Sequence, residues 1–435
     1  GSPIAYWVSD RIRDIYDKGK SMSDIAHSFQ GMITGDNSYF LRLWYEVETN
    51  NVLLGDTSIE RQAMVWIPYK KGGGFRKWYG NNEFVLRWEE GGRNLTRART
   101  ENRKYYLREA LTWSYITSSK FSALYFEEGF LWDVAGSSMF LDNEKYTLFE
   151  VLGFLNSIVA ENILAIINPT LNFQVENILA LPFIQSKQDK CKVEILVDDC
   201  VGIAKSDWDS FETSWDFQRH PLLAHKAGSS LEQAFNNWAA FAEEQFQQLK
   251  ANEEELNRIF IKIYGLEDEL TPEVDDDDVT IRRADRERDI KSFISYAVGC
   301  MFGRYSLDEE GLVYAGGDFD AARYGSFPVV EDNILTILDD QYFDNDIVSR
   351  FVDFVRVTFG PAMLEQNLEY IAHSLRRSAS DTARETIRKY FLRDFYKDHT
   401  RIYKKRPIYW LFSSPQGGFN SLVYMHRYDR DTVAR

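Results

Sequence analysis

The residues whose types and spacing could do chemistry are basic, and most of them gather between Arg61 and Lys120. This stretch holds thirteen Lys and Arg against five Glu, a surplus of +8 in a chain whose net charge is −16. Its densest part joins positive charge, side-chain-free backbone and a flat ring: Lys70, Lys71, Gly72–Gly74, Arg76, Lys77 and Trp78. Glycines let a phosphate approach the backbone closely. The pattern favours contact with nucleic acid, and the alternative is a solvated surface around a Gly-rich hairpin loop.

Arginines continue through the same stretch. The guanidinium group presents a planar fork of donors that fits a phosphate or the major-groove edge of guanine. We expect some of these side chains to neutralise phosphates, Arg103 among them, and a few to read base edges: Arg76, Arg93, Arg97 and Arg99. A chain with Arg76→Ala and Lys77→Ala is therefore expected to fold normally and to lose sequence-specific binding.

A second basic segment lies between Ile371 and Trp410, where eleven Lys and Arg face four acids. It ends in Lys404, Lys405 and Arg406, followed by an aromatic stretch. Two basic segments in one acidic protein predict a duplex that lies between two lobes.

The usual catalytic patterns do not occur in this sequence. There is no GxGxxG after a strand, no GxxxxGK[ST], no GxSxG and no HExxH. The histidines are scattered, and Cys191, Cys200 and Cys300 are too few and too far apart for a disulfide framework or a zinc site. No apolar run is long enough to span a membrane, and the first residues lack a signal-peptide pattern. We expect a binding module in a reducing cytoplasm.

The elements that position these residues predict an α+β protein. Short β-branched and aromatic runs between residues 60 and 134 predict strands with loops between them. Residues 147–167 predict one buried helix that ends at Asn168-Pro169. Residues 229–264 and 289–305 predict long amphipathic helices that hold the lobes apart. The expected fold is a mixed β/α domain followed by a mostly α-helical C-terminal region.

Eight longer motifs follow one another along the chain: TGDNSYFLRLW (34–44), PYKKGGGFRKWYGNN (68–82), LTWSYITSSKFSALYF (111–126), FLWDVAGSSMF (130–140), LGFLNSIVAENILAIINPTLNFQ (152–174), EEELNRIFIKIYGLEDELTPEV (253–274), DIKSFISYAVGCMFGRYSLDEEGLVYAGG (289–317) and KKRPIYWLFSSPQGGFNSLVYMHRY (404–428). In this order they resemble the PglX family, the adenine-specific DNA methyltransferases of bacterial BREX phage-defence systems. Related single-chain restriction–modification enzymes share the resemblance, which covers nearly the whole chain.

The resemblance also implies what this chain lacks. Family members carry a Gly-rich S-adenosylmethionine motif and an Asn-Pro-Pro-Tyr catalytic motif on their N-terminal side, and neither occurs here. The nearest string, Asn168-Pro169-Thr170-Leu171, lacks the second proline and the ring that stacks on a flipped adenine. We therefore expect no cofactor in this chain, S-adenosylmethionine in the missing methyltransferase domain, and no activity from this chain alone.

The implied organisation has four parts. Residues 1–30 form a connecting helix from the missing methyltransferase domain, and residues 31–186 form the DNA target-recognition domain. Residues 187–283 form a helical spacer with an acidic loop, and residues 284–435 form a helical C-terminal domain. The match at the entry to the recognition domain implies that Gly35, Asp36 and Asn37 face DNA.

The expected partners are double-stranded DNA and the methyltransferase domain of the same protein, in the bacterial cytoplasm near the nucleoid and away from membranes. Two other interpretations remain open. The chain could be mainly a protein-interaction platform for other BREX components. It could also be a docking surface for a phage DNA-mimic inhibitor, which would use the same basic residues.

Overall fold

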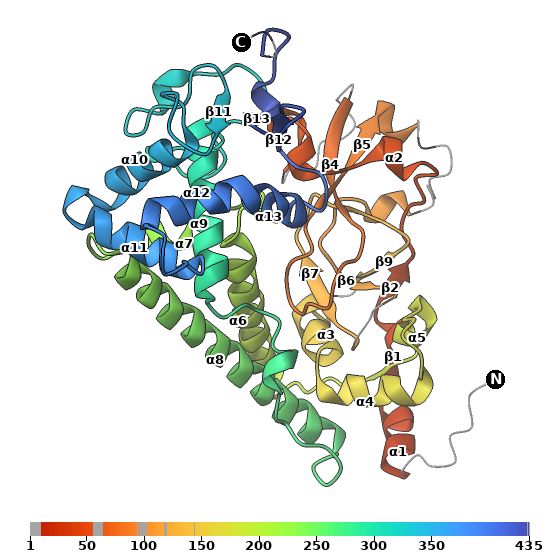
Figure 1. Cartoon of the computed structure of the whole chain (residues 1–435). Helices are drawn as coiled ribbons and strands as arrows, with labels where there is room; N and C mark the ends of the chain where they lie inside the picture. The colour runs from red at the N-terminus through yellow and green to blue at the C-terminus, as the bar shows by residue number, and fades with distance from the viewer. Residues whose placement is uncertain are drawn as a thin grey trace. The chain divides into compact units, whose positions relative to one another are not determined.

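The computed structural model describes residues 10–54, 64–93, 95, 102–116, 120–142, 144–432 and 434 (Figure 1). The chain divides into two compact units. The first, the sheet unit, comprises Gly1–Trp44, Asn51–Trp208 and Gln245–Arg282. The second, the helical unit, comprises Tyr45–Asn50, Asp209–Glu244 and Arg283–Arg435. This division is by compactness, and the four functional segments expected from the sequence remain a prediction.

The sheet unit contains two four-stranded sheets. One has the order β2-β9-β6-β7 and consists of β2 (His27–Phe29), β9 (Gly136–Phe140), β6 (Ala110–Ser114) and β7 (Ala123–Phe126). The other has the order β3-β5-β4-β8 and consists of β3 (Leu41–Leu43), β5 (Phe84–Glu89), β4 (Met64–Lys70) and β8 (Leu131–Trp132). In β5, Leu86 and Trp88 point into the core while Arg87 points away from it, as the alternation of a strand requires. The strands predicted between residues 60 and 134 are confirmed.

Helices surround these sheets within the same unit. They are α1 (Asp10–Lys18), α2 (Asn37–Phe40), α3 (Leu148–Leu155), α4 (Ile158–Ile167), α5 (Val175–Leu179), α6 (Lys190–Asp209) and the C-terminal half of α8 (Leu231–Tyr264). A two-residue ladder joins β1 (Lys20–Ser21) to β10 (Pro182–Phe183). Apart from α2, whose Phe40 packs in the core of the β3-β5-β4-β8 sheet, these helices share one core with β6 and β9, in which Leu152, Val197 and Phe260 are buried.

The single helix predicted for residues 147–167 is wrong, because the chain bends by 66° between α3 and α4. Asn156 ends α3 and uses its side chain to bond both the N–H and the C=O of Ala123, at 2.9 and 3.0 Å. Ser157 then caps α4 by accepting from Ala160 N. The bend therefore arises because the Asn156 side chain hydrogen-bonds the backbone of β7, where the helix would otherwise continue.

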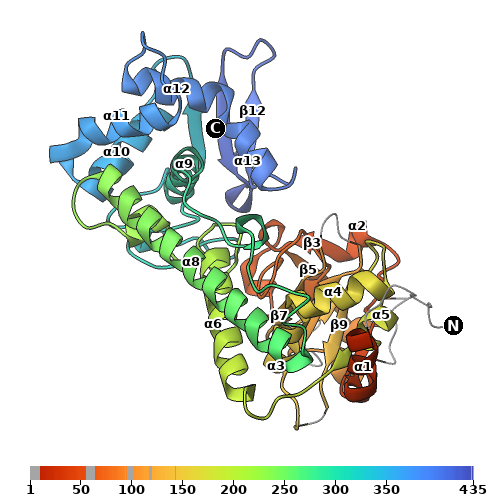
Figure 2. The ribbon, with the colours of Figure 1, turned by 90° about the horizontal axis from the view of Figure 1, so that it is seen from below.

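The helical unit joins helices to one small sheet. Its helices are α7 (Pro221–Ala224), the N-terminal half of α8, α9 (Arg286–Phe302), α10 (Ile347–Phe359), α11 (Leu364–Ser374), α12 (Ala383–Arg393) and α13 (Phe395–Ile402). Its sheet has the order β11-β13-β12 and consists of β11 (Ile334–Ile337), β13 (Asn420–Tyr424) and β12 (Tyr409–Ser413). Helices α10, α11 and α12 lie side by side (Figures 1 and 2). The predicted long helices are confirmed as α8 and α9, and the α+β fold class is confirmed with them.

In the part of the chain that the structure describes, no single helix has both the length and the apolar composition to cross a membrane. The pair α3 and α4 reaches that length and composition only together, across the bend described above.

Candidate nucleic-acid interface

Lys70 ends β4 and is almost completely buried, with 2% of its surface exposed. Its Nζ donates to Gly80 O at 3.0 Å and to Asn82 Oδ1, and it lies 5.1 Å from the centre of the Phe130 ring. Burial lowers the pKa of this amine to about 7. Lys70 therefore closes the loop of residues 71–82 from inside, and a phosphate cannot reach it in this structure.

The glycines of the same loop make room for the protein's own chain. Gly72 has φ +77°, and a Cβ there would lie 2.9 Å from Ala135 O. Gly73 exchanges hydrogen bonds with Ser114 Oγ through its N–H and its C=O, each at 3.0 Å. Asn81 donates to Gly74 O at 3.1 Å. The loop is thus held by internal bonds, although Gly73 and Gly74 remain exposed.

Arg76 is also buried, with 8% of its surface exposed. Its guanidinium donates to Asp207 Oδ2 and Ala204 O, both at 2.9 Å, and to Tyr79 O at 2.6 Å. It stacks over the ring of Trp208 at 5.2 Å. Arg76 thereby fastens the loop of residues 71–82 to α6.

Lys77 and Trp78 fasten the same loop to α8. Lys77 Nζ forms an ion pair with Glu253 Oε2, and Trp78 Nε1 donates to Glu253 Oε1, both at 2.7 Å. Glu253 and Trp78 are buried, at 3% and 1% exposed. One carboxylate thus receives both donors inside the protein, where such charge-assisted bonds are strong.

These four side chains form a clasp, which we define as Lys70, Arg76, Lys77 and Trp78 with their internal partners. The clasp leaves none of the four available to DNA, contrary to the expected DNA contacts of these residues. The expectation that Arg76→Ala with Lys77→Ala leaves the fold intact also disagrees with this burial. Lys71, the neighbouring base, is half-buried and pairs with Asp133 at 3.3 Å.

The segment Gly35–Asn37 is exposed and forms a tight turn into α2. Gly35 supplies the positive φ of +78° that the turn needs. Asp36 caps α2, accepting from Ser38 N at 2.9 Å and from Tyr39 N at 3.1 Å. Hydrogen bonds from the Ser38 hydroxyl and then from Tyr39 N–H hold the pKa of Asp36 below its ordinary value. An ionised, exposed Asp36 repels phosphate, but its carboxylate can accept from the amino group of cytosine.

Exposed cations of the sheet unit lie further along the basic stretch. Arg93 and Arg103 are exposed, and Arg103 donates to Gly91 O at 3.1 Å, which leaves most of its donors toward solvent. Lys104 is exposed and lies 4.7 Å from the centre of the Tyr105 ring. Arg97 and Arg99 lie outside the described residues. Arg93, Arg103 and Lys104 therefore offer charge where the clasp does not.

One polar sheet face was missed by the sequence reasoning. Arg42 on β3 lies opposite Val85 of β5, so Arg42 and Arg87 share the sheet face opposite to Leu86 and Trp88. Val85 is fully buried on this face, and Arg87 pairs with Glu89 at 2.5 Å. The Arg87 guanidinium lies 4.7 Å over the ring of Tyr39, which is 44% exposed. The signal was available, because Arg alternates with buried residues in both LRL and FVLRW.

In the helical unit, a groove of about 560 Å³ runs along α13 and the residues after it. Its lining contains cations but no acid: Tyr396, Lys397, Thr400, Arg401, Lys404 and Lys405. Lys404 and Lys405 have φ of +51° and +63°, so the chain turns sharply at the C-terminal end of α13. Arg406 is exposed and reaches Glu46 only at 3.7 Å. This groove, which we call the lysine groove, therefore gathers exposed cations beside a largely apolar lining.

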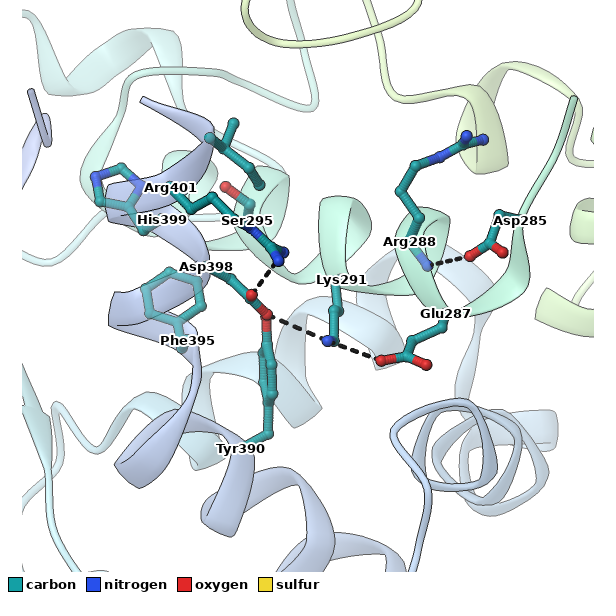
Figure 3. A pocket seen from close by; sticks show the side chains of 11 residues that line it. Asp285, Glu287, Arg288, Lys291, Ser295, Tyr390, Phe395, Asp398, His399 and Arg401 are labelled. Atoms are coloured by element: carbon teal, nitrogen blue, oxygen red, sulfur yellow. Dashed lines mark hydrogen bonds and ion pairs between the residues drawn. The ribbon is translucent and has the colours of Figure 1, made fainter. Parts of the chain in front are cut away.

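A neighbouring cleft of about 280 Å³ is lined by side chains of both charges (Figure 3). Asp398 lies between Arg401 and Lys291, at 2.8 and 3.3 Å, and accepts from Tyr390 OH at 3.2 Å. Lys291 also pairs with Glu287 at 2.9 Å and lowers the pKa of that carboxyl. Each of these charges already has a partner of opposite sign, so the cleft offers little to an anion.

A third depression excludes DNA by its charge. It lies in the sheet unit, measures about 710 Å³, and is lined by five acids and one arginine: Glu109, Glu128, Asp142, Glu144, Glu194 and Arg108. Arg108 is itself paired with Asp142 at 2.9 Å. Over the described residues, no group of three or more His, Cys, Asp or Glu is placed to hold a metal ion.

Two curated relatives align with the whole of this chain. One is the adenine-specific methyltransferase PglX of Lacticaseibacillus casei (strain Zhang), 45% identical over 455 residues. Another is the adenine-specific methyltransferase BrxX of Escherichia coli O9:H4 (strain HS), 35% identical over 467 residues. The chain spans only 37% and 38% of the length of these relatives. No family model matches it.

Proposed function

Because the chain is homologous along its whole length to the adenine-specific methyltransferases PglX and BrxX, we propose that it is the DNA-recognition portion of such an enzyme. In this proposal it binds a DNA duplex for an adenine-N6 methyltransferase of bacterial phage defence, in the cytoplasm near the nucleoid. The homology carries the proposal. The surface chemistry supports it, since each unit exposes cations and the groove along α13 has no acid in its lining.

Phosphate contacts come from cations whose side chains are exposed. In the sheet unit these are Arg103 and Lys104, and in the helical unit they are Lys404 and Lys405 of the lysine groove. Arg406 lies next to the groove and extends it. Such contacts fix register and orientation without reading sequence.

Base reading belongs to the exposed polar residues of the sheet unit. Arg93 retains the bidentate donors that suit guanine, and Arg97 and Arg99 are proposed with it from the sequence. Asn37 offers an amide that suits adenine, Asp36 accepts from cytosine, and Gly35 lets the backbone approach. The clasp residues serve instead to hold the loop of residues 71–82 in place.

We assign no residue of this chain to S-adenosylmethionine. The glycine-rich turn at Gly72–Gly74 is occupied by Ser114 and Asn81 of the protein itself, so it does not fit a cofactor. We propose that methyl transfer is carried out by the part of the relatives that this chain does not span. This chain contributes by placing the duplex.

The test is a fluorescence-anisotropy titration of the chain with a labelled random-sequence duplex at several salt concentrations. Five phosphate contacts predict that the logarithm of affinity falls with the logarithm of salt with a slope of about −4 to −5. Replacing Lys404 and Lys405 by Gln should reduce the slope by about 2.

A matched control removes two charges elsewhere in the helical unit. Arg384→Gln with Lys389→Gln changes net charge equally, but these side chains are paired with Glu365 and Asp381 at 2.7 and 2.6 Å. The control should leave the slope nearly unchanged. An absence of binding at low salt, or equal slopes for the two double variants, would contradict the proposal.

A further inference from the structure

β12 is an edge strand with an open side. It pairs with β13 and with no other strand among those described. Met425 N donates to Ile408 O at 2.9 Å and Ser414 N donates to Phe419 O at 2.8 Å, so even-numbered residues turn their backbone toward β13. Leu411 and Ser413 therefore turn their N–H and C=O outward. Of the outward groups, Tyr409 N already donates to His399 Nε2 at 3.1 Å.

This edge lacks the usual protection against strand pairing. Exposed edges are commonly blunted by lysine, proline or a bulge, and the sequence Tyr-Trp-Leu-Phe-Ser of β12 has none of these. Instead, Trp410 and Phe412 are 38% and 40% exposed on the sheet face that points away from the core. A hydrophobic edge of this kind is suited to accept a further strand.

The aromatic surface continues across the sheet. Phe419 lies on the same face, and its ring lies 6.3 Å from the ring of Phe343, edge to face. Tyr342 is 64% exposed beside it, and the ring centres of Trp410 and Tyr428 lie 5.5 Å apart. Contiguous exposed aromatic side chains of this kind mark interaction surfaces.

The charges beside this surface select its occupant. Asp339, Asp340 and Asp344 are exposed around Tyr342 and Phe343, and none of the three forms an ion pair within the described part of the helical unit. Carboxylates next to exposed aromatic rings repel a nucleic-acid strand and attract lysine or arginine. The favoured occupant is a basic protein segment.

We propose that β12 is the docking strand for an extended segment of a protein partner, which adds to the sheet along the outward backbone of Leu411 and Ser413. Alternate apolar side chains of that segment pack on Trp410 and Phe412, and basic residues face Asp339, Asp340 and Asp344. The proposal is independent of DNA binding, because no residue of this surface belongs to the proposed phosphate or base contacts.

The experiment selects displayed short random peptides on the full chain and then measures the selected peptides by fluorescence anisotropy. Leu411→Pro removes one outward N–H without a bond to β13, and Leu411→Val keeps that N–H. Selected peptides should alternate apolar residues, carry net positive charge, and bind Leu411→Pro at least about tenfold more weakly than Leu411→Val. Hydrogen exchange at Leu411 and Ser413 should slow when peptide binds.

A second variant keeps the test decisive if Leu411→Pro does not fold. Trp410→Ser with Phe412→Ser changes only exposed side chains of β12 and should also abolish peptide binding. Failure to select any peptide, or selected peptides that bind all variants equally, overturns the proposal. Oligothymidine that binds through Trp410 and Phe412 would overturn it as well, in favour of a single-stranded nucleic acid.

Discussion

Within the clasp, Arg76 is expected to stabilise the folded sheet unit. The substitution Arg76→Ala tests this expectation. Arg76 donates to four acceptors: Asp207 Oδ2, Ala204 O, Tyr79 O and Thr280 O. The side chains of Arg76 and Asp207 are 9% and 7% exposed, so solvent cannot replace the lost donors easily. We expect Arg76→Ala to lower the free energy of unfolding of the sheet unit.

The size of this loss in unfolding free energy depends on which cation still pairs with Asp207 when Arg76 is removed. Removing one partner of a buried ion pair costs about 3–5 kcal/mol, because the other charge is left uncompensated. Here Arg282 Nε remains 3.3 Å from Asp207 Oδ1, so the carboxylate keeps one cation. The expected loss is therefore at the lower end, about 3 kcal/mol.

Urea unfolding followed by tryptophan fluorescence measures this loss, since Trp208 stacks on the Arg76 guanidinium. Arg103→Ala is the matched control, because it removes the same charge from an exposed side chain and should change stability by about 0.5 kcal/mol or less. DNA affinity is measured under conditions where both variants are folded.

We expect Arg103→Ala to weaken DNA binding at full stability, whereas Arg76→Ala should lose stability first. Equal stability of the two variants, together with a specific loss of DNA affinity in Arg76→Ala, would refute the clasp. In that case the loop of residues 71–82 would open on DNA and release Arg76 for base reading.

Two buried ionisable groups make further predictions, both of them about pH. Burial raises the pKa of Glu212 to about 7, so between its ordinary value of 4.5 and pH 7 the folded state holds a proton that the unfolded state has lost. Stability of the helical unit should therefore fall by about 3 kcal/mol from pH 4.5 to 7, and thermal unfolding of Glu212→Gln should lack that fall. Lys70 behaves in the opposite sense, because burial lowers its pKa from 10.5 to about 7. Between those values the unfolded state binds more protons, so stability of the sheet unit should rise with pH by about 1 kcal/mol per unit, and urea unfolding of Lys70→Met should show no such rise. Parallel pH profiles for variant and parent would contradict either statement.

Local patterns in the sequence predicted most of the elements. The three- and four-residue apolar steps of α8 and α9, and the short aromatic runs of β4 to β8, are properties of neighbouring residues. The break between α3 and α4 could not be predicted in this way. Asn156 bonds Ala123, a residue that is distant along the chain and is brought near only by the fold.

The candidate site likewise contains some residues whose exposure local sequence predicts and others whose partners are brought near only by the fold. Exposure at Lys404 and Lys405 follows from their place after the last turn of α13, which the sequence places correctly at the end of a basic helical segment. The clasp could not be anticipated, because Arg76 and Lys77 find Asp207 and Glu253 far away in the sequence. Nothing in the sequence Lys70–Trp78 itself distinguishes a phosphate-binding loop from a loop held by buried ion pairs and hydrogen bonds.

The positive surplus of a sequence segment therefore overstates the charge that DNA would meet. Many cations of the stretch from Arg61 to Lys120 are engaged by acids supplied from elsewhere in the chain, as Lys71 is by Asp133 and Lys120 is by Asp278. Such pairs cancel the field beyond a few ångströms, and salt screens what remains. In the proposed complex, the cations that steer a duplex are those with exposed side chains. A slope of about −4 to −5 is thus the expected mark of recognition here, and a clearly steeper one would mean that DNA opens the clasp.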